Sequence, residues 1–241
     1  MKKIIIIMVV LSFGLTLVSN AQKKVALTTF WVKKYIGFDQ LDGPAALATQ
    51  IMTLSENPNF DLSSVLDNFY ETFTKEYSKE FPFELMTEEE ILKSESYMTY
   101  EPKWDNGLML FKQYLTPKDY KVMTESLIKG ENSNSRQMLK MFPNADGVMF
   151  VTMGYDFVKK TVPFTAGVRA FVKIKLWNQE GKKVFSIREY GTSKKSVAIV
   201  GGIPIMKPSK LLPLCESASE KLVSDLSKKI GKVTKKAAKK L

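Results

Sequence analysis

Histidine is absent from the 241 residues of this chain, and Cys215 is its only cysteine. The absence of histidine removes the commonest general base, the usual partner of a serine or cysteine nucleophile and the commonest zinc ligand. A single cysteine cannot form an intrachain disulfide, so burial alone must hold the fold together. We therefore expect a protein that is not an enzyme, with no catalytic residues, no metal site and no cofactor.

Sequence motifs for phosphate binding and for serine acylation are also missing. Neither G-x-x-x-x-G-K-[ST] nor G-x-G-x-x-G occurs, and no acidic run has the spacing of a calcium loop. Ser126–Lys129 matches S-x-x-K, but neither S-D-N nor K-T-G follows it, so we attribute this match to chance.

The first 21 residues have the pattern of a secretory signal peptide. Lys2 and Lys3 precede the apolar run Ile4–Val18, which is short for a membrane span, and small residues lead up to Ala21. We predict cleavage near Ala21/Gln22 and a mature protein that is periplasmic or secreted; a retained membrane anchor is the alternative. No cysteine lies near the cut, so there is no lipobox.

Composition predicts one folded domain. About 220 residues remain after cleavage, which suits one domain with insertions or at most two small ones. The chain is 44% apolar and contains 15 phenylalanines, enough for a packed core. We assign 1–21 to the signal peptide, 22–230 to one α+β domain with 98–133 as a possible insertion, and 231–241 to a lysine-rich tail.

Positive charge is concentrated near the C-terminus. The net charge is +11, but Lys228–Leu241 holds seven lysines and no acid, and Lys2 and Lys3 belong to the predicted leader, so only +2 remains for the body. For an exported chain we expect no nucleic-acid partner. Anionic lipid headgroups or acidic cell-wall polymers are the better candidates.

Apolar runs and alternation predict the strands, while spacing and capping residues predict the helices. The strand candidates are Lys24–Val32, Phe81–Met86, Gly147–Tyr155, Val168–Trp177 and Lys183–Tyr190, the last two joined by a turn at 178–181. The helix candidates are Asp61 to about Lys79, a helix capped by Thr87 with Glu90, Ser135–Phe142, a helix from Thr116 to Gly130, and the amphipathic Lys210–Ile230. Together they predict an α+β fold: a single mixed or antiparallel sheet of about four to five strands, covered by helices, with a C-terminal amphipathic helix.

Three short motifs carry a family resemblance: the strand-to-helix step Phe83–Thr87, the strand start Pro143–Met149 and the hairpin Gln179–Val184. With these motifs in this order, the chain resembles the periplasmic α/β modules shared by the curli secretion lipoprotein, the lipoprotein activators of penicillin-binding proteins and the N-terminal domain of the Tol-Pal translocation protein B. The resemblance implies protein or envelope binding, and at most assembly of a multimer. That group has no shared catalytic residues to transfer to this chain.

Two segments are candidates for contact with a partner or a membrane. The segment 198–206 is an apolar stretch broken by glycine and proline; it is either an exposed patch or the buried end of a strand. The tail is either a basic amphipathic end that rests on anionic lipid or a frayed terminus. The candidate contact residues are Ile199, Val200, Ile203, Ile205, Met206, Lys228, Lys229, Lys232, Lys235, Lys236, Lys239 and Lys240.

The favoured function is an exported, non-catalytic binding or assembly module of the cell envelope. Its partner would be an envelope protein or an anionic membrane surface, and it could form a homo-oligomer. One alternative is a periplasmic enzyme that uses carboxylates or lysine and needs a pocket of convergent ionisable groups. Another is a carrier of an apolar ligand, with a cavity lined by Phe69, Phe73, Phe150 and Trp177.

Overall fold

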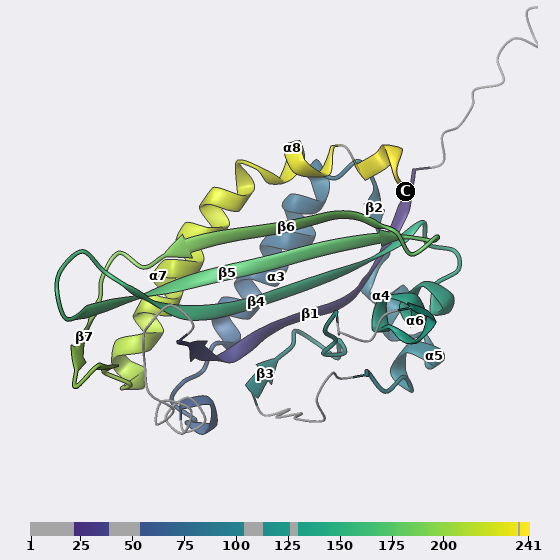
Figure 1. The fold of residues 1–241 in the computed structure, drawn as a ribbon. Coiled ribbons are helices and arrows are strands. Elements are labelled where there is room, and N and C mark those ends of the chain that lie inside the picture. The colour runs from purple at the N-terminus through teal and green to yellow at the C-terminus, as the bar shows by residue number, and fades with distance from the viewer. Residues whose placement is uncertain (1–21, 39–53, 104–112, 126–129, 236) are drawn as a thin grey trace, which may run out of the picture.

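The computed structural model describes residues 22–38, 54–103, 113–125, 130–235 and 237–241. The predicted leader lies outside these residues. Within them, one mixed sheet is covered on one face by two helices, and a group of short helices lies at one end of it (Figure 1). This arrangement is the predicted α+β class with a single sheet.

The sheet contains eight strands among the described residues, in the order β2-β1-β4-β5-β7-β8, with β3 added to β1 and β6 added to β5. β1 is parallel to β2 and β4, and the other pairs are antiparallel. The strands are β1 (Lys24–Gly37), β2 (Glu84–Leu85), β3 (Tyr114–Leu115), β4 (Gly147–Lys159), β5 (Thr165–Asn178), β6 (Lys183–Thr192), β7 (Val197–Val200) and β8 (Ile203–Pro204).

The prediction of about four to five strands is therefore wrong, because the described residues form eight. The predicted long strands and the step at β2 are present, but β3, β7 and β8 have only two, four and two residues. Strands this short have too few residues to show a period of two. β3 and β7 pair with edges of the long strands β1 and β5, and β8 pairs with β7.

The motif Pro143–Met149 starts β4 and ties it to β1. The Asp146 carboxylate accepts hydrogen bonds from the Lys24 backbone N–H at 2.8 Å and from Lys23 Nζ at 2.9 Å. Burial opposes ionisation of Asp146, but these two donors and the charge of Lys23 hold its pKa below the usual value. The motif thus fixes where the parallel pair begins.

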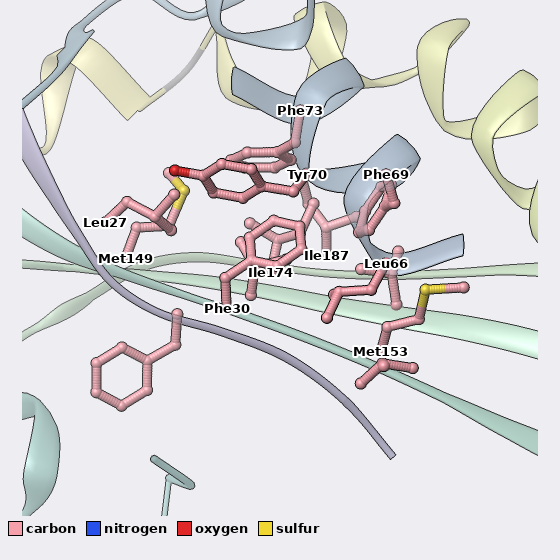
Figure 2. Close-up of a cluster of buried hydrophobic side chains, with 14 of the residues drawn as sticks. Leu27, Phe30, Leu66, Phe69, Tyr70, Phe73, Met149, Met153, Ile174 and Ile187 are labelled. Atoms are coloured by element: carbon pink, nitrogen blue, oxygen red, sulfur yellow. The ribbon is translucent and has the colours of Figure 1, made fainter. Parts of the chain in front are cut away.

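Helices α3 (Ser63–Lys75) and α7 (Pro208–Ser227) cover one face of the sheet. The inward residues of β5 alternate as predicted and are fully buried. Figure 2 shows the core between β1 and α3, where the Phe30 ring centroid lies 5.3 Å from Phe69, 5.1 Å from Tyr70 and 5.7 Å from Phe73. The aromatic stripe predicted on this helix is therefore packed core.

Two details of the predicted first helix are wrong. The N-cap is Leu62, while the Asp61 carboxylate accepts bonds from the N–H and hydroxyl of Ser63. The α-helix ends at Lys75 and continues as a separate 3₁₀ turn, η1 (Tyr77–Glu80).

The short helices are α4 (Glu88–Leu92), α5 (Glu95–Met98) and α6 (Asn134–Met141), with a 3₁₀ turn η3 (Gly130–Asn132). The capping box of α4 is confirmed: Glu90 N–H donates to Thr87 Oγ1 at 3.2 Å, and Thr87 N–H donates to Glu90 Oε2 at 2.7 Å.

The helix predicted from Thr116 to Gly130 is wrong over its described residues, because 116–125 is not helical. Lys121 and Met123 of this segment lie on the face of β1 opposite α3, where their backbone carbonyls accept hydrogen bonds from side chains of β1. Thr29 Oγ1 donates to the Lys121 carbonyl at 2.5 Å, and Trp31 Nε1 donates to the Met123 carbonyl at 2.8 Å. Side chains from β1 therefore take the place of helical hydrogen bonds.

Candidate functional site

The predicted apolar segment 198–206 forms a two-stranded hairpin, β7–β8. Gly201 and Gly202 occupy its two-residue turn with φ of 59° and 83°, the left-handed region that glycine adopts without strain. Val200, opposite Ile203, is 68% exposed, while Ile199, Ile203, Ile205 and Met206 are half-buried. The segment is thus a partly exposed projection.

The loop between β4 and β5 adjoins this hairpin. Ile199 N–H donates to the Phe164 carbonyl at 2.7 Å, and Thr165 of β5 pairs with Ala198 of β7. In this loop the side chains of Val162 and Phe164 are 61% and 82% exposed. We call the surface made by Val162, Phe164, Ile199, Val200 and Ile203 the apolar tip.

Sequence reasoning missed the half of the apolar tip that β4 and β5 supply. The available signal was the run Val162-Pro163-Phe164, because a turn between two long strands is expected to be polar. Within the described residues, Val162, Phe164 and Val200 are the most exposed of the large apolar side chains. Single exposed apolar residues are ordinary, whereas a contiguous group of them marks a contact surface.

Lysines flank the apolar tip. The two stretches that form it and its base, 157–168 and 190–215, contain six lysines and no aspartate or glutamate. Lys160 Nζ donates to the Ser193 carbonyl at 2.6 Å, which joins the two stretches below the tip. The other five lysines, all exposed, are Lys159, Lys194, Lys195, Lys207 and Lys210.

The tail packs against the body of the protein. After α7 it forms α8 (Ile230–Thr234) and a 3₁₀ turn η4 (Ala237–Lys239), and Ile230, Thr234 and Ala237 are at most 2% exposed. Asn178 Nδ2 donates to the Lys240 carbonyl at 2.9 Å. The apolar residues that would enter a membrane in an amphipathic tail are therefore mostly committed to the protein's own core.

Two of the predicted tail lysines form ion pairs. Lys229 lies 2.9 Å from Glu189 and Lys228 lies 3.6 Å from Asp225. Lys232, Lys235, Lys239 and Lys240 are exposed, and Lys236 lies outside the described residues.

The apolar tip and the tail lie at opposite ends of the sheet (Figure 1). The tip joins the start of β5 at Thr165, whereas the tail bonds to its last residue, Asn178. These two positions are the ends of the 14-residue strand β5 and lie about 43 Å apart at the usual rise of a strand. The two predicted contact regions therefore do not form one surface.

The apolar-ligand cavity predicted from four aromatic residues does not form. Phe69 and Phe73 pack on Phe30 at the helix-covered face, while Phe150 and Trp177 contact each other on the opposite face with ring centroids 4.9 Å apart. The sheet itself separates the two pairs.

A cleft of about 820 Å³ lies between α3, β2 and the turn at 117–120. In its wall Tyr70 donates a hydrogen bond to Glu88 at 2.9 Å and lies 3.3 Å from the Tyr120 hydroxyl. Burial is the main cause that raises the phenol pKa of Tyr70 far above its usual range and that of Tyr120 to about 12. Both phenols stay protonated at neutral pH, so they cannot act as general bases there, and Tyr70 already donates its one hydroxyl hydrogen to Glu88.

The sheet face opposite the helices carries cations and aromatic rings. The guanidinium of Arg188 lies 5.2 Å from the Tyr190 ring centroid and 5.7 Å from that of Phe171. Burial and the neighbouring charges of Arg188, Lys33 and Lys175 lower the pKa of Lys173. The alternation seen in the sequence of β5 signals this face, although it does not show the aromatic rings of neighbouring strands.

Cys215 is fully buried on α7, as predicted, and burial raises the pKa of its thiol well above the usual value. In the described part of the chain, no group of three or more Asp, Glu and Cys side chains is placed to hold a metal ion. None of the described helices combines the length and apolarity that crossing a bilayer requires.

No protein-family model matches the chain, and no curated protein matches it. Among solved structures it is similar to a candidate lipoprotein from Caulobacter crescentus, with 14% identity and a TM-score of 0.25 over 44% of this chain and 82% of that one. A hypothetical protein from Chlamydia trachomatis has 6% identity and a TM-score of 0.33, over 89% of this chain and 98% of that one. A DUF330 protein from Xanthomonas campestris has 9% identity and a TM-score of 0.26, over 45% of this chain and 66% of that one. At these TM-scores no shared family is established, and the resemblance to the periplasmic α/β modules stays a prediction.

Proposed function

We propose that this protein is an exported, non-catalytic binding module of the cell envelope and that the apolar tip makes the contact. The exposure of Phe164 and Val200, on two adjoining hairpins joined by the hydrogen bond from Ile199 to Phe164, is the observation that supports it. Leaving such a surface in water is unfavourable, which makes contact with a partner favourable. The secretory pattern of the first 21 residues supports a partner outside the cytoplasm.

Site-specific photo-crosslinking in cells tests this proposal. A benzophenone amino acid replaces Phe164 in the full-length chain, and the matched control carries it at Val233, which is 39% exposed on α8 at the other end of the molecule. We expect envelope components, protein or lipid, to be captured from position 164 and not from position 233. Equal capture from both positions would contradict the assignment of the tip.

Export is tested by fractionating the same cells and sequencing the N-terminus of the recovered protein. We expect a chain that begins near Gln22 in the periplasmic or secreted fraction. A chain that retains Met1 in the cytosol would contradict the proposal. The remaining proposed partner is a second copy of this chain. Sedimentation of the purified protein tests whether the protein associates with itself.

A further inference from the structure

We propose that the apolar tip docks on an anionic lipid bilayer, with Phe164, Val162 and Val200 entering the headgroup region and the flanking lysines contacting lipid phosphates. This inference rests on the proposed function and names its partner.

The shape of the tip suits a lipid surface. Its apolar side chains lie at the end of two adjacent hairpins that are joined by a main-chain hydrogen bond, from Ile199 to Phe164, and by strand pairing at Thr165 and Ala166. A second bond, from Thr165 Oγ1 to the Val162 carbonyl at 2.7 Å, closes the loop itself. The tip is therefore held as a projection and needs little ordering when it inserts.

The charge around the tip favours a bilayer with anionic lipid. The six lysines come from three places in the chain: Lys159 and Lys160 precede the loop, Lys194 and Lys195 precede β7, and two more lie where α7 begins. No acid occurs in the stretches that carry them. Exposed apolar side chains flanked by lysines combine the two terms that hold proteins at membrane surfaces, apolar burial and attraction to anionic headgroups.

Vesicle binding with a site-specific dye tests the proposal. The chain from Gln22 onward contains every described strand and helix. Because Cys215 is fully buried, an environment-sensitive dye attaches selectively to a thiol introduced by Val200→Cys. The matched control is Val233→Cys. The probes are vesicles of phosphatidylglycerol mixed with phosphatidylcholine, and vesicles of phosphatidylcholine alone.

We expect the dye at position 200 to shift to the blue with the anionic vesicles and to stay unchanged with the neutral ones, while the dye at position 233 stays unchanged with both. Raising the salt concentration should weaken binding, because it screens the attraction to the lysines. The double variant Phe164→Asn/Val200→Thr should bind the anionic vesicles at least about tenfold more weakly, since it removes two apolar side chains from the contact. Asparagine tolerates the positive φ of 56° at position 164, so the loop keeps its conformation.

Two results would overturn the bilayer proposal. One is that the labelled Val200→Cys variant does not bind anionic vesicles although its melting temperature equals that of the unsubstituted protein. The other is that the dye shifts equally at positions 200 and 233. Either result leaves the proposed function standing if photo-crosslinking from position 164 captures an envelope protein. Absence of any crosslink from that position would contradict both.

Discussion

At the scale of single residues, Gly191 shows how closely the sheet and α7 approach. A Cβ at this position would overlap the backbone of α7 at Ala218 and Leu222. The helix cannot withdraw without opening the packing of its buried stripe. We predict that Gly191→Ala lowers the free energy of unfolding by about 1–3 kcal/mol, measured by urea denaturation.

The matched control is Gly201→Asn. Gly201 also lacks a side chain, but nothing lies within 4 Å of a Cβ there, and asparagine accepts its positive φ. A stability loss for this variant as large as that of Gly191→Ala would show that loss of glycine itself, and not contact with α7, is responsible.

At the scale of elements, α4 depends on its capping box. The helix has five residues, too few to be stable without end contacts. Thr87→Ala removes the acceptor for the Glu90 N–H, and we expect it to lower the free energy of unfolding by about 1 kcal/mol. Thr87→Ser keeps a hydroxyl at the same place and should restore most of the loss. If serine destabilises as much as alanine, the hydroxyl is not the stabilising group.

The tail is a structural element as well as a charged one. Because Ile230, Thr234 and Ala237 are buried, we predict that ending the chain at Ser227 lowers the free energy of unfolding by at least about 2 kcal/mol. Replacing Lys232, Lys235, Lys239 and Lys240 with glutamine removes charge alone and should change it by less than about 0.5 kcal/mol. Urea denaturation of both variants separates the two roles; equal stability of the truncated and intact chains would contradict this account.

Elements with a local signal could be predicted from the sequence, and those that depend on distant partners could not. The hairpin at 178–181 and the cap at Thr87 are encoded by neighbouring residues. Tyr120 and Met123 have helical spacing and are indeed buried, yet they lie in a segment that is not helical. Spacing reports burial, whereas the geometry of that segment comes from Thr29 and Trp31, about 90 residues earlier in the chain.

At the scale of the whole molecule, dependence on distant residues also explains why only part of the candidate site could be predicted. The sequence indicated the half of the apolar tip that lies in one apolar segment, 198–206. It did not indicate that the loop with Val162 and Phe164 lies beside it, because this depends on β7 pairing with the start of β5. It also did not show that the tail folds back on the body. Segment 198–206 and the tail were both candidates, and the fold places them at opposite ends of the sheet (Figure 1).

Buried tyrosines spread through the whole molecule predict how it responds to alkali. Tyr77 donates its hydroxyl hydrogen to the Val223 carbonyl and Tyr97 donates to the Thr28 carbonyl, both at 2.7 Å, so ionisation would remove both donors. Burial is the main cause that raises the pKa of Tyr77 and Tyr120 to about 12, and it also raises that of Tyr155. The folded state therefore keeps protons that the unfolded chain releases above its ordinary pKa of about 10.

The sign of the effect follows from this difference in bound protons. The stabilising contribution is complete below about pH 10 and falls as the pH rises toward 12, by up to about 1.4 kcal/mol per pH unit for each such phenol. We predict that phenolate absorbance from these tyrosines rises together with the loss of far-ultraviolet circular dichroism. If all nine tyrosines ionise near pH 10 while the dichroism is unchanged, then the phenols are not buried as the fold requires. Because these tyrosines come from η1 to β4, their joint behaviour tests the assembly of the sheet and its helices as one cooperative unit.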